Sequence, residues 1–278
     1  MSEDKKESYS YLIASGWWAC EKERDTREKL LGDDQIRDIS FHALWRHCID
    51  SFSTPQEIVI IDSASPIKPN DVAGEFWVSL NKNYGHSTAH ETKLCGVSRS
   101  FILSMMYAYV NDYDYWVYVE QDALIYGDNV IDLAIQSAKT GVAMGDGKST
   151  PQPIQQSLMV FRKDRIVEFV YRYNQINALD SEISPEWKFV FALNKLAPYL
   201  PSSFLRYLCR RSSARLVRRF KKMLLGFIQI FNDFNYLPFG YGRVRPINFQ
   251  AKQFYFQHAS DEELAYFNQM LNTKNQSD

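Results

Sequence analysis

The sequence predicts an α/β fold with a mainly parallel sheet flanked by helices. Strand-like segments alternate with helix-like segments over the first 175 residues, which is typical of βαβ units. The clearest strand, EIVIID at residues 57–62, is a nearly unbroken β-branched run and suits an inner parallel strand covered on both faces. Polar and acidic residues follow the strand-like segments directly, as at a ligand-binding sheet edge.

The elements follow from the hydrophobic pattern. In the first helix Ile36, Leu44, Cys48 and Ile49 fall on roughly one helical face, and Pro55 lies beyond its end. YWVYV is an aromatic and β-branched run, and FYFQ is a late strand that precedes His258. Strands are predicted at 9–15, 57–62, 76–80, 115–119, 141–144, 157–161 and 254–257, and helices at 36–52, 90–110, 130–139 and 164–173.

Composition limits the class of protein. The chain has 278 residues, of which 45% are hydrophobic, enough to bury a large core. Its four cysteines are spaced like neither a zinc site nor a disulfide framework, which favours a reducing, cytoplasmic environment. No apolar run reaches the roughly 18 residues of a membrane span.

Charge is distributed unevenly although the net charge is only −1. Residues 201–232 contain eight bases and no acid, which leaves −9 for the remainder. On a helical wheel a basic side stands against an apolar side, as in helices that bind anionic membrane surfaces. The alternative is a helix whose apolar side packs on the rest of the protein; nucleic-acid binding is less favoured, because the bases share one helix. The basic side holds Arg211, Arg215, Arg218 and Lys222, and the apolar side Leu216, Phe220, Met223, Leu224 and Phe227.

Carboxylates at strand ends are the candidate functional groups. Asp62 ends the second strand, and Glu120 and Asp122 follow the fourth. Because ligands of open α/β sheets bind at the carboxyl ends of the strands, these acids are favoured over Asp112 and Asp114, which precede the fourth strand. Two carboxylates at this spacing can share a divalent cation that neutralises a diphosphate.

Several enzyme classes lack support. The chain has no Ser-His-Asp order, GxSxG elbow, Walker loop or GxGxxG. His86 and His90 stand four residues apart, but the Glu of HExxH is missing. The sequence therefore does not favour a hydrolase, an ATPase, a Rossmann dehydrogenase or a metalloprotease.

The order EIVIIDSAS, VSLNKNYGHS, a long apolar helix and DYDYWVYVEQDALIYGD resembles the nucleotide-sugar glycosyltransferases of the GT-A fold, over about residues 9–165. The resemblance implies that Asp62 contacts the nucleotide base and that Asn83 lies in the loop after the third strand. It also implies that Glu120-Gln121-Asp122 stands for the metal-binding D-x-D motif, with Glu in place of the first Asp and Asp122 as the main ligand.

The resemblance further implies that His258 completes a Mn²⁺ or Mg²⁺ shell; a half-buried, hydrogen-bonded histidine is the alternative. Arg243 and Arg245 are candidates for binding the diphosphate, or are ordinary surface arginines. The acid that deprotonates an acceptor hydroxyl is expected among Glu186, Glu182 and Asp146, each of which could instead be a helix N-terminal or turn acid.

The expected function is metal-dependent, inverting transfer of a sugar from a UDP- or GDP-type donor to a glycan or lipid-linked acceptor, in bacterial capsule or lipopolysaccharide synthesis. The rival is a non-catalytic membrane- or partner-binding protein of the same fold. The expected location is cytoplasmic, with peripheral binding to the inner face of the cell membrane and no nucleic-acid partner. The expected division is a catalytic core at 1–200, a basic amphipathic helical segment at 201–232 and a C-terminal segment at 233–278 that returns to the active site.

Overall fold

The computed structural model describes residues 9–21, 34–70, 73–88 and 90–275. Its centre is a seven-stranded sheet with the order β3-β2-β1-β4-β7-β6-β8. Strands β1 to β4 are mutually parallel, β7 is antiparallel to both of its neighbours, and β6 pairs parallel with β8. The strands are β1 (Tyr11–Trp17), β2 (Glu57–Asp62), β3 (Glu75–Ser79), β4 (Tyr115–Val119), β6 (Val142–Asp146), β7 (Ile154–Arg162) and β8 (Asn235–Tyr236).

A second, three-stranded sheet joins the C-terminal segment to the centre of the fold. It consists of β5 (Ala123–Tyr126), β10 (Phe254–Gln257) and β9 (Tyr241–Gly242), with β10 in the middle. Strand β10 runs antiparallel to β5, which follows β4 after a tight turn, and Gln257 lies opposite Ala123. The late part of the chain is thereby held beside the carboxyl end of β4.

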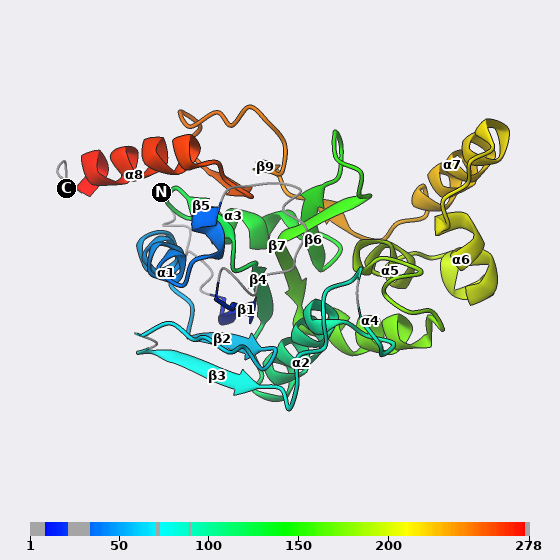
Figure 1. Ribbon diagram of the computed structural model, residues 1–278, viewed down its shortest axis with the longest axis horizontal. Helices are drawn as coiled ribbons and strands as arrows, with labels where there is room; N and C mark the ends of the chain where they lie inside the picture. The colour runs from blue at the N-terminus through cyan, green and yellow to red at the C-terminus, as the bar shows by residue number, and fades with distance from the viewer. Residues whose placement is uncertain (1–8, 22–33, 71–72, 89, 276–278) are drawn as a thin grey trace, which may run out of the picture.

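Alternating side chains of the main sheet feed two hydrophobic cores. In β1, for example, Ile13 belongs to one core and Leu12 to the other, because successive side chains of a strand point to opposite faces. Helices α1 (Phe41–Phe52), α3 (Val130–Ser137) and α8 (Asp261–Asn275) cover the first core. Helices α2 (Gly96–Val110), α4 (Lys163–Gln175) and α5 (Pro185–Ala192) cover the second, on the other side of the sheet (Figure 1).

Two further helices, α6 (Ser202–Cys209) and α7 (Arg215–Gln229), form a hairpin that projects beyond α5 at one end of the molecule (Figure 1). Short 3-10 helices precede α1 (Asp34–Arg37) and α6 (Ala197–Tyr199). Among the residues described, no helix is both long and apolar enough to cross a bilayer.

The predicted α/β fold with a mainly parallel sheet is confirmed. The boundaries of β2 and β4 are as predicted, whereas α2 begins at Gly96 rather than at residue 90. The backbone N–H of Cys95, just before α2, donates to the carboxylate of Asp180, so an acid distant in sequence caps the start of this helix. The basic segment at 201–232 contains two helices, because the chain leaves the helical conformation at Arg210. The sequence analysis did not predict β5 or α8.

Candidate functional site

The predicted metal motif lies in the turn between β4 and β5. The Glu120 N–H donates to the carbonyl oxygen of Ser157 on β7, and the Ala123 N–H donates back to the Glu120 carbonyl oxygen. Gln121 exchanges two hydrogen bonds with the backbone of Trp18, just after β1. The turn is therefore fixed to both neighbouring strands, and the carboxylates of Glu120 and Asp122 are free to face a common point.

That common point is the amide group of Gln257. Its Nε2 donates to Glu120 Oε2 at 2.7 Å and to Asp122 Oδ1 at 2.8 Å. The next residue, His258, places Nε2 3.2 Å from Asp122 Oδ2. Thus three residues that the sequence analysis selected as metal ligands, Glu120, Asp122 and His258, lie together, with Gln257 between the two acids.

Arg243 fixes the orientation of the Gln257 amide. Its Nε donates to Gln257 Oε1 at 3.0 Å, and its backbone N–H donates to the side-chain oxygen of Gln155. Gly242 has a φ of +53°, and a Cβ there would lie 2.1 Å from the Gln155 oxygen, so this close approach requires glycine. The positive charge of Arg243 thereby reaches the acid pair through one amide.

The acid pair holds its protons unevenly. Burial and the charge of Asp122 together raise the pKa of the Glu120 carboxyl to about 8. Burial alone would also raise the pKa of Asp122, but hydrogen bonds from His258 and Gln257 and the charges of His258 and Arg243 hold it below its ordinary value. The directions of the two pKa shifts therefore favour the proton on Glu120 and the negative charge on Asp122.

A pocket opens beside this network. Glu120 and Arg243 line it on one side, and Glu186 lines it from the first turn of α5. Within the described part of the chain, the carboxylate of Glu186 has no hydrogen-bond or ion-pair partner. The pocket is completed by His86, Ser87, Val97, Thr150, Gln152, Ile154, Gln155, Gln156 and Pro185.

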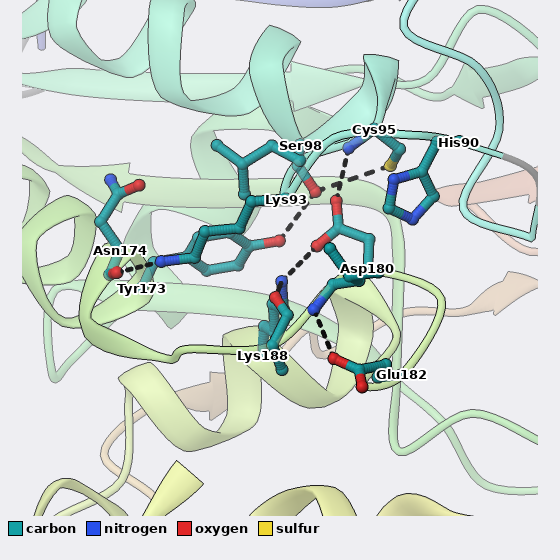
Figure 2. A network of polar contacts seen from close by, with 12 residues as sticks. His90, Lys93, Cys95, Ser98, Tyr173, Asn174, Asp180, Glu182 and Lys188 are labelled. Atoms are coloured by element: carbon teal, nitrogen blue, oxygen red, sulfur yellow. Dashed lines mark hydrogen bonds and ion pairs between the residues drawn. The ribbon is translucent and has the colours of Figure 1, made fainter.

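A buried ion pair holds α5 in place. Lys188 Nζ lies 2.6 Å from Asp180 Oδ1 and also donates to the carbonyl oxygen of Ala178, and both charged side chains are fully buried. The other oxygen of Asp180 accepts the N–H of Cys95 at the start of α2 (Figure 2). Because Lys188 lies two residues after Glu186, this pair fixes the turn of α5 that carries Glu186 relative to α2.

The other two base candidates lie differently. Glu182 does not line the pocket: one of its oxygens accepts the N–H of Leu179 and the other lies 3.1 Å from Arg206 on α6. The hydrogen bond from Leu179 and the one from Arg206 hold the pKa of Glu182 below its ordinary value. Asp146 ends β6, where its carboxylate accepts the N–H of Lys148 in an exposed turn.

The residues expected to hold the nucleotide lie along the same sheet edge. Asp62 is buried and bonds to its own loop and to β3: Ser65 N–H donates to one carboxylate oxygen, and Lys68 and the hydroxyl of Ser79, at the end of β3, reach the other. Asn83 is exposed in the loop after β3, where its side-chain oxygen accepts the N–H of Gly85.

Arg245 has a different environment from Arg243. Its guanidinium lies 2.6 Å from Glu263 on α8 and donates to the backbone oxygens of Gly242 and Gln257. Arg245 therefore braces the loop between β9 and β10, whereas Arg243 lines the pocket.

The residues at the motif fit a divalent cation by their chemistry. Carboxylate oxygens and imidazole suit Mn²⁺; His258 turns Nε2 toward Asp122, and its Nδ1 is buried without a hydrogen-bond partner among the described residues. In the described ranges, no three His, Cys, Asp or Glu side chains already stand in a metal-binding arrangement. The N–H groups of Gln257 occupy the space between the acids, so a cation bound there would take their place.

Sequence reasoning missed two glutamines. Gln257 bridges the acids, and Gln155 holds the backbone of Arg243 while donating to the Asp146 carbonyl oxygen. Both are buried polar residues inside strands, β10 and β7. For Gln257 the available signal was a glutamine at the end of an otherwise apolar strand, since a buried amide requires polar partners. Gln155 gave no such signal, because it stands beside Gln156 and Ser157 in β7.

Comparison with known proteins gives likenesses in structure alone. No protein-family model matches the chain, and the search of curated proteins found no match. The chain resembles several solved structures, of which two are sugar transferases and one is a complex with UDP. The mannosyltransferase PcManGT from Pyrobaculum calidifontis, in complex with GDP-Man and Mn²⁺, shares 12% identity and a TM-score of 0.43, over 79% of this chain and 69% of that chain.

The galactosyltransferase LgtC, in complex with donor and acceptor sugar analogues, gives 7% identity and a TM-score of 0.40, over 75% of this chain and 81% of that chain. TarS from S. aureus, in complex with UDP, gives 10% identity and a TM-score of 0.38, over 66% of this chain and 54% of that chain. Such likenesses concern the fold, so an activity has to follow from the residues of the site.

Proposed function

We propose that the protein is a metal-dependent glycosyltransferase that moves a sugar from a nucleoside-diphosphate donor to a glycan or lipid-linked acceptor. The observation that carries the proposal is the convergence of Glu120, Asp122 and His258 at the carboxyl end of β4, beside a pocket that Arg243 and Glu186 line. Two carboxylates and an imidazole that can hold a cation, together with an arginine, suit a phosphorylated ligand at this sheet edge.

The donor would lie along the sheet edge. Asp122, Glu120 and His258 would hold Mn²⁺ or Mg²⁺, which supplies positive charge to the departing diphosphate. Arg243 stands beside the same acids and would bind diphosphate oxygens. Arg245 supports the loop between β9 and β10 through its bonds to backbone oxygens. Asp62 and Asn83 follow the neighbouring strands and would contact the nucleotide, of UDP or GDP type.

The acceptor would be activated from α5. Glu186 faces the pocket without a partner among the described residues, so its carboxylate is available to accept the proton of an acceptor hydroxyl. Attack from that side would displace the diphosphate with inversion. Glu182 is held by Arg206 and Leu179, which leaves Glu186 the better placed of the two. A role in assembling a bacterial surface polysaccharide is part of this proposal.

The test is a panel of UDP- and GDP-sugars, with thermal stabilisation and donor hydrolysis measured with and without Mn²⁺. We expect one donor to raise the melting temperature and to be hydrolysed slowly, both only with the metal. If no donor stabilises the protein at any metal concentration, the proposal is wrong and the non-catalytic alternative takes its place.

A further inference from the structure

Helix α7 has three distinct sides. At 100° per residue, the first side carries Val217, Lys221, Leu224, Leu225 and Ile228, all buried or half-buried. Lys221 donates to the backbone oxygens of Tyr207 on α6 and of Arg210 just after it, and its Nζ lies 4.0 Å from the Tyr207 ring centroid. Among the described residues, the members of α7 that join the second core, Leu224, Leu225 and Ile228, all lie on this first side.

The second side is an exposed apolar stripe. Its members follow one another at alternating spacings of four and three residues, and each side chain is between 50% and 78% exposed. The members of the apolar stripe are Leu216, Phe220, Met223, Phe227 and Ile230. The sequence analysis left open whether the apolar side packs on the rest of the protein. Against the described residues Leu224 packs into the core, whereas Leu216, Phe220, Met223 and Phe227 remain at least half exposed.

The third side is a basic flank that adjoins the apolar stripe. Its side chains are exposed, and none forms an ion pair with a described residue. Since residues 201–232 contain no acid, nothing within the hairpin neutralises them. The basic flank consists of Arg215, Arg218, Arg219 and Lys222 on α7, together with Arg211, which the helical wheel placed on the same helix but which lies in the non-helical segment just before it.

The hairpin is held firmly enough to present this surface. Asn194, just after α5, donates from one amide to the carbonyl oxygen of Ile228 and to the side-chain oxygen of Asn232. Lys221 fastens the other part of α7 to α6. The apolar stripe therefore remains on the outside of a fixed projection, at the end of the molecule in Figure 1.

We propose that α7 is an interfacial helix that binds the protein to an anionic lipid bilayer. The apolar stripe would enter the boundary of the acyl chains, and the basic flank would lie among anionic headgroups. Fifteen helical residues span about 22 Å, too short to cross a bilayer, so the helix lies along the surface. This inference goes beyond the proposed activity and does not depend on it.

Charge distinguishes a membrane from the other occupants of such a surface. A second copy of the chain would bring one basic flank close to another, which costs free energy, whereas an anionic bilayer complements it. Nucleic acid would satisfy the bases but would leave the apolar stripe in water. Of these three partners, an anionic lipid surface is the one that suits both sides together.

The experiment is co-sedimentation of the full-length protein with vesicles of phosphatidylcholine alone or with 30% phosphatidylglycerol. A basic variant changes Arg211, Arg215, Arg218 and Lys222 to Gln, and an apolar variant changes Leu216, Phe220 and Phe227 to Gln. The matched control changes four other exposed bases, Lys139, Lys148, Lys195 and Lys252, to Gln. Circular dichroism checks that each variant keeps its helices.

We expect binding to the anionic vesicles at low salt and loss of binding at 1 M salt, where the Debye length falls from about 10 Å at 0.1 M to about 3 Å. Each base near an anionic surface strengthens binding about fivefold, so the basic variant should partition several hundredfold more weakly. The apolar variant should also bind more weakly, and the control should bind like the wild type.

Three results would overturn the proposal. If the wild-type protein does not bind anionic vesicles at low salt, a membrane is not its partner. Equal losses in the basic variant and in the matched control show a nonspecific charge effect. A dimer in sedimentation velocity that only the apolar variant abolishes, without vesicle binding, assigns the stripe to a second copy. Because the readout is binding, it is separate from any failure to find a sugar donor.

Discussion

Gln257 donates a 2.8 Å hydrogen bond to Asp122 across 135 positions of the chain. The contact depends on β10 lying antiparallel to β5, so the last part of the chain completes a site that the middle part begins. The same amide also bonds to Glu120. Two neighbouring acids that share one donor lose it together if that residue changes.

Gln257→Leu should therefore destabilise the metal-free protein more than the protein with Mn²⁺. Without the amide, two half-buried acids lose a shared donor, and an unpaired polar group costs at most about 1–3 kcal/mol, the value for full burial. A cation between the acids replaces the lost interaction. The measurement is the melting temperature of variant and wild type with and without Mn²⁺. A deficit that Mn²⁺ leaves unchanged would show that no cation binds between these carboxylates.

Asp122→Ala should abolish sugar transfer and Mn²⁺-dependent nucleotide binding while the protein remains folded. The carboxylate is the member of the acid pair that stays ionised, because its pKa lies below the ordinary value. Isothermal titration with nucleotide and Mn²⁺ measures the loss. The control is Asp114→Asn, an acid that precedes β4 at the opposite end of the sheet and bonds to Ser10. Unchanged turnover in Asp122→Ala would end the metal-site assignment.

Glu186→Gln should lower turnover by at least about a hundredfold and leave donor affinity nearly unchanged, since a general base contributes about 10² to 10⁴ in rate. Steady-state kinetics with saturating donor separates the two quantities. Glu182→Gln is the matched comparison, because its carboxylate already bonds to Arg206 and Leu179. A large loss in Glu182→Gln or Asp146→Asn, with Glu186→Gln unaffected, would move the base to that residue.

The sequence predicted the strands of the main sheet better than the surroundings of the site. EIVIID and YWVYV are apolar runs whose form depends on local pattern and burial, and their boundaries agree with β2 and β4. Likewise, acids after the fourth strand could be selected because strand ends are ligand edges. Gln257, the residue opposite these acids, could not be selected in the same way.

The unpredicted parts depend on contacts distant in sequence. The register of β10 on β5 brings Gln257 to Asp122, and Asp180 caps α2 from beyond α4. Strands of four residues give little periodicity, and of two such strands the sequence analysis predicted β10 but not β5. The helical wheel found the basic side of α7, but it could not show which apolar residues pack. Leu224 and Phe220 are both apolar, and only the surrounding structure shows that Leu224 packs whereas Phe220 is exposed.

Lys188→Met should lower the free energy of unfolding by about 3–5 kcal/mol, because it leaves the carboxylate of Asp180 buried without its cation. Adding Asp180→Asn should recover part of this loss, since the uncompensated charge disappears. Denaturant titration measures both. As a control, Asp50→Asn breaks a largely exposed pair with Arg46 and should cost less than about 1 kcal/mol. If the double variant is less stable than Lys188→Met by as much as Asp180→Asn alone destabilises the wild type, the two side chains do not act as a pair.

Stability at acidic pH should depend on Asp233, which follows α7 and joins it to α4. Burial alone would raise the pKa of Asp233, but Arg165 at 2.8 Å and Lys195 at 3.4 Å hold it below the ordinary value. A carboxyl whose folded pKa is depressed contributes stability above its unfolded pKa and loses it as the pH falls through the folded pKa. The wild type should therefore be more stable than Asp233→Asn at neutral pH, and the difference should shrink below about pH 4, near the unfolded pKa of Asp. Urea titrations at pH 7 and at pH 3 measure the difference; one that stays constant between them would mean that the charge of Asp233 contributes nothing.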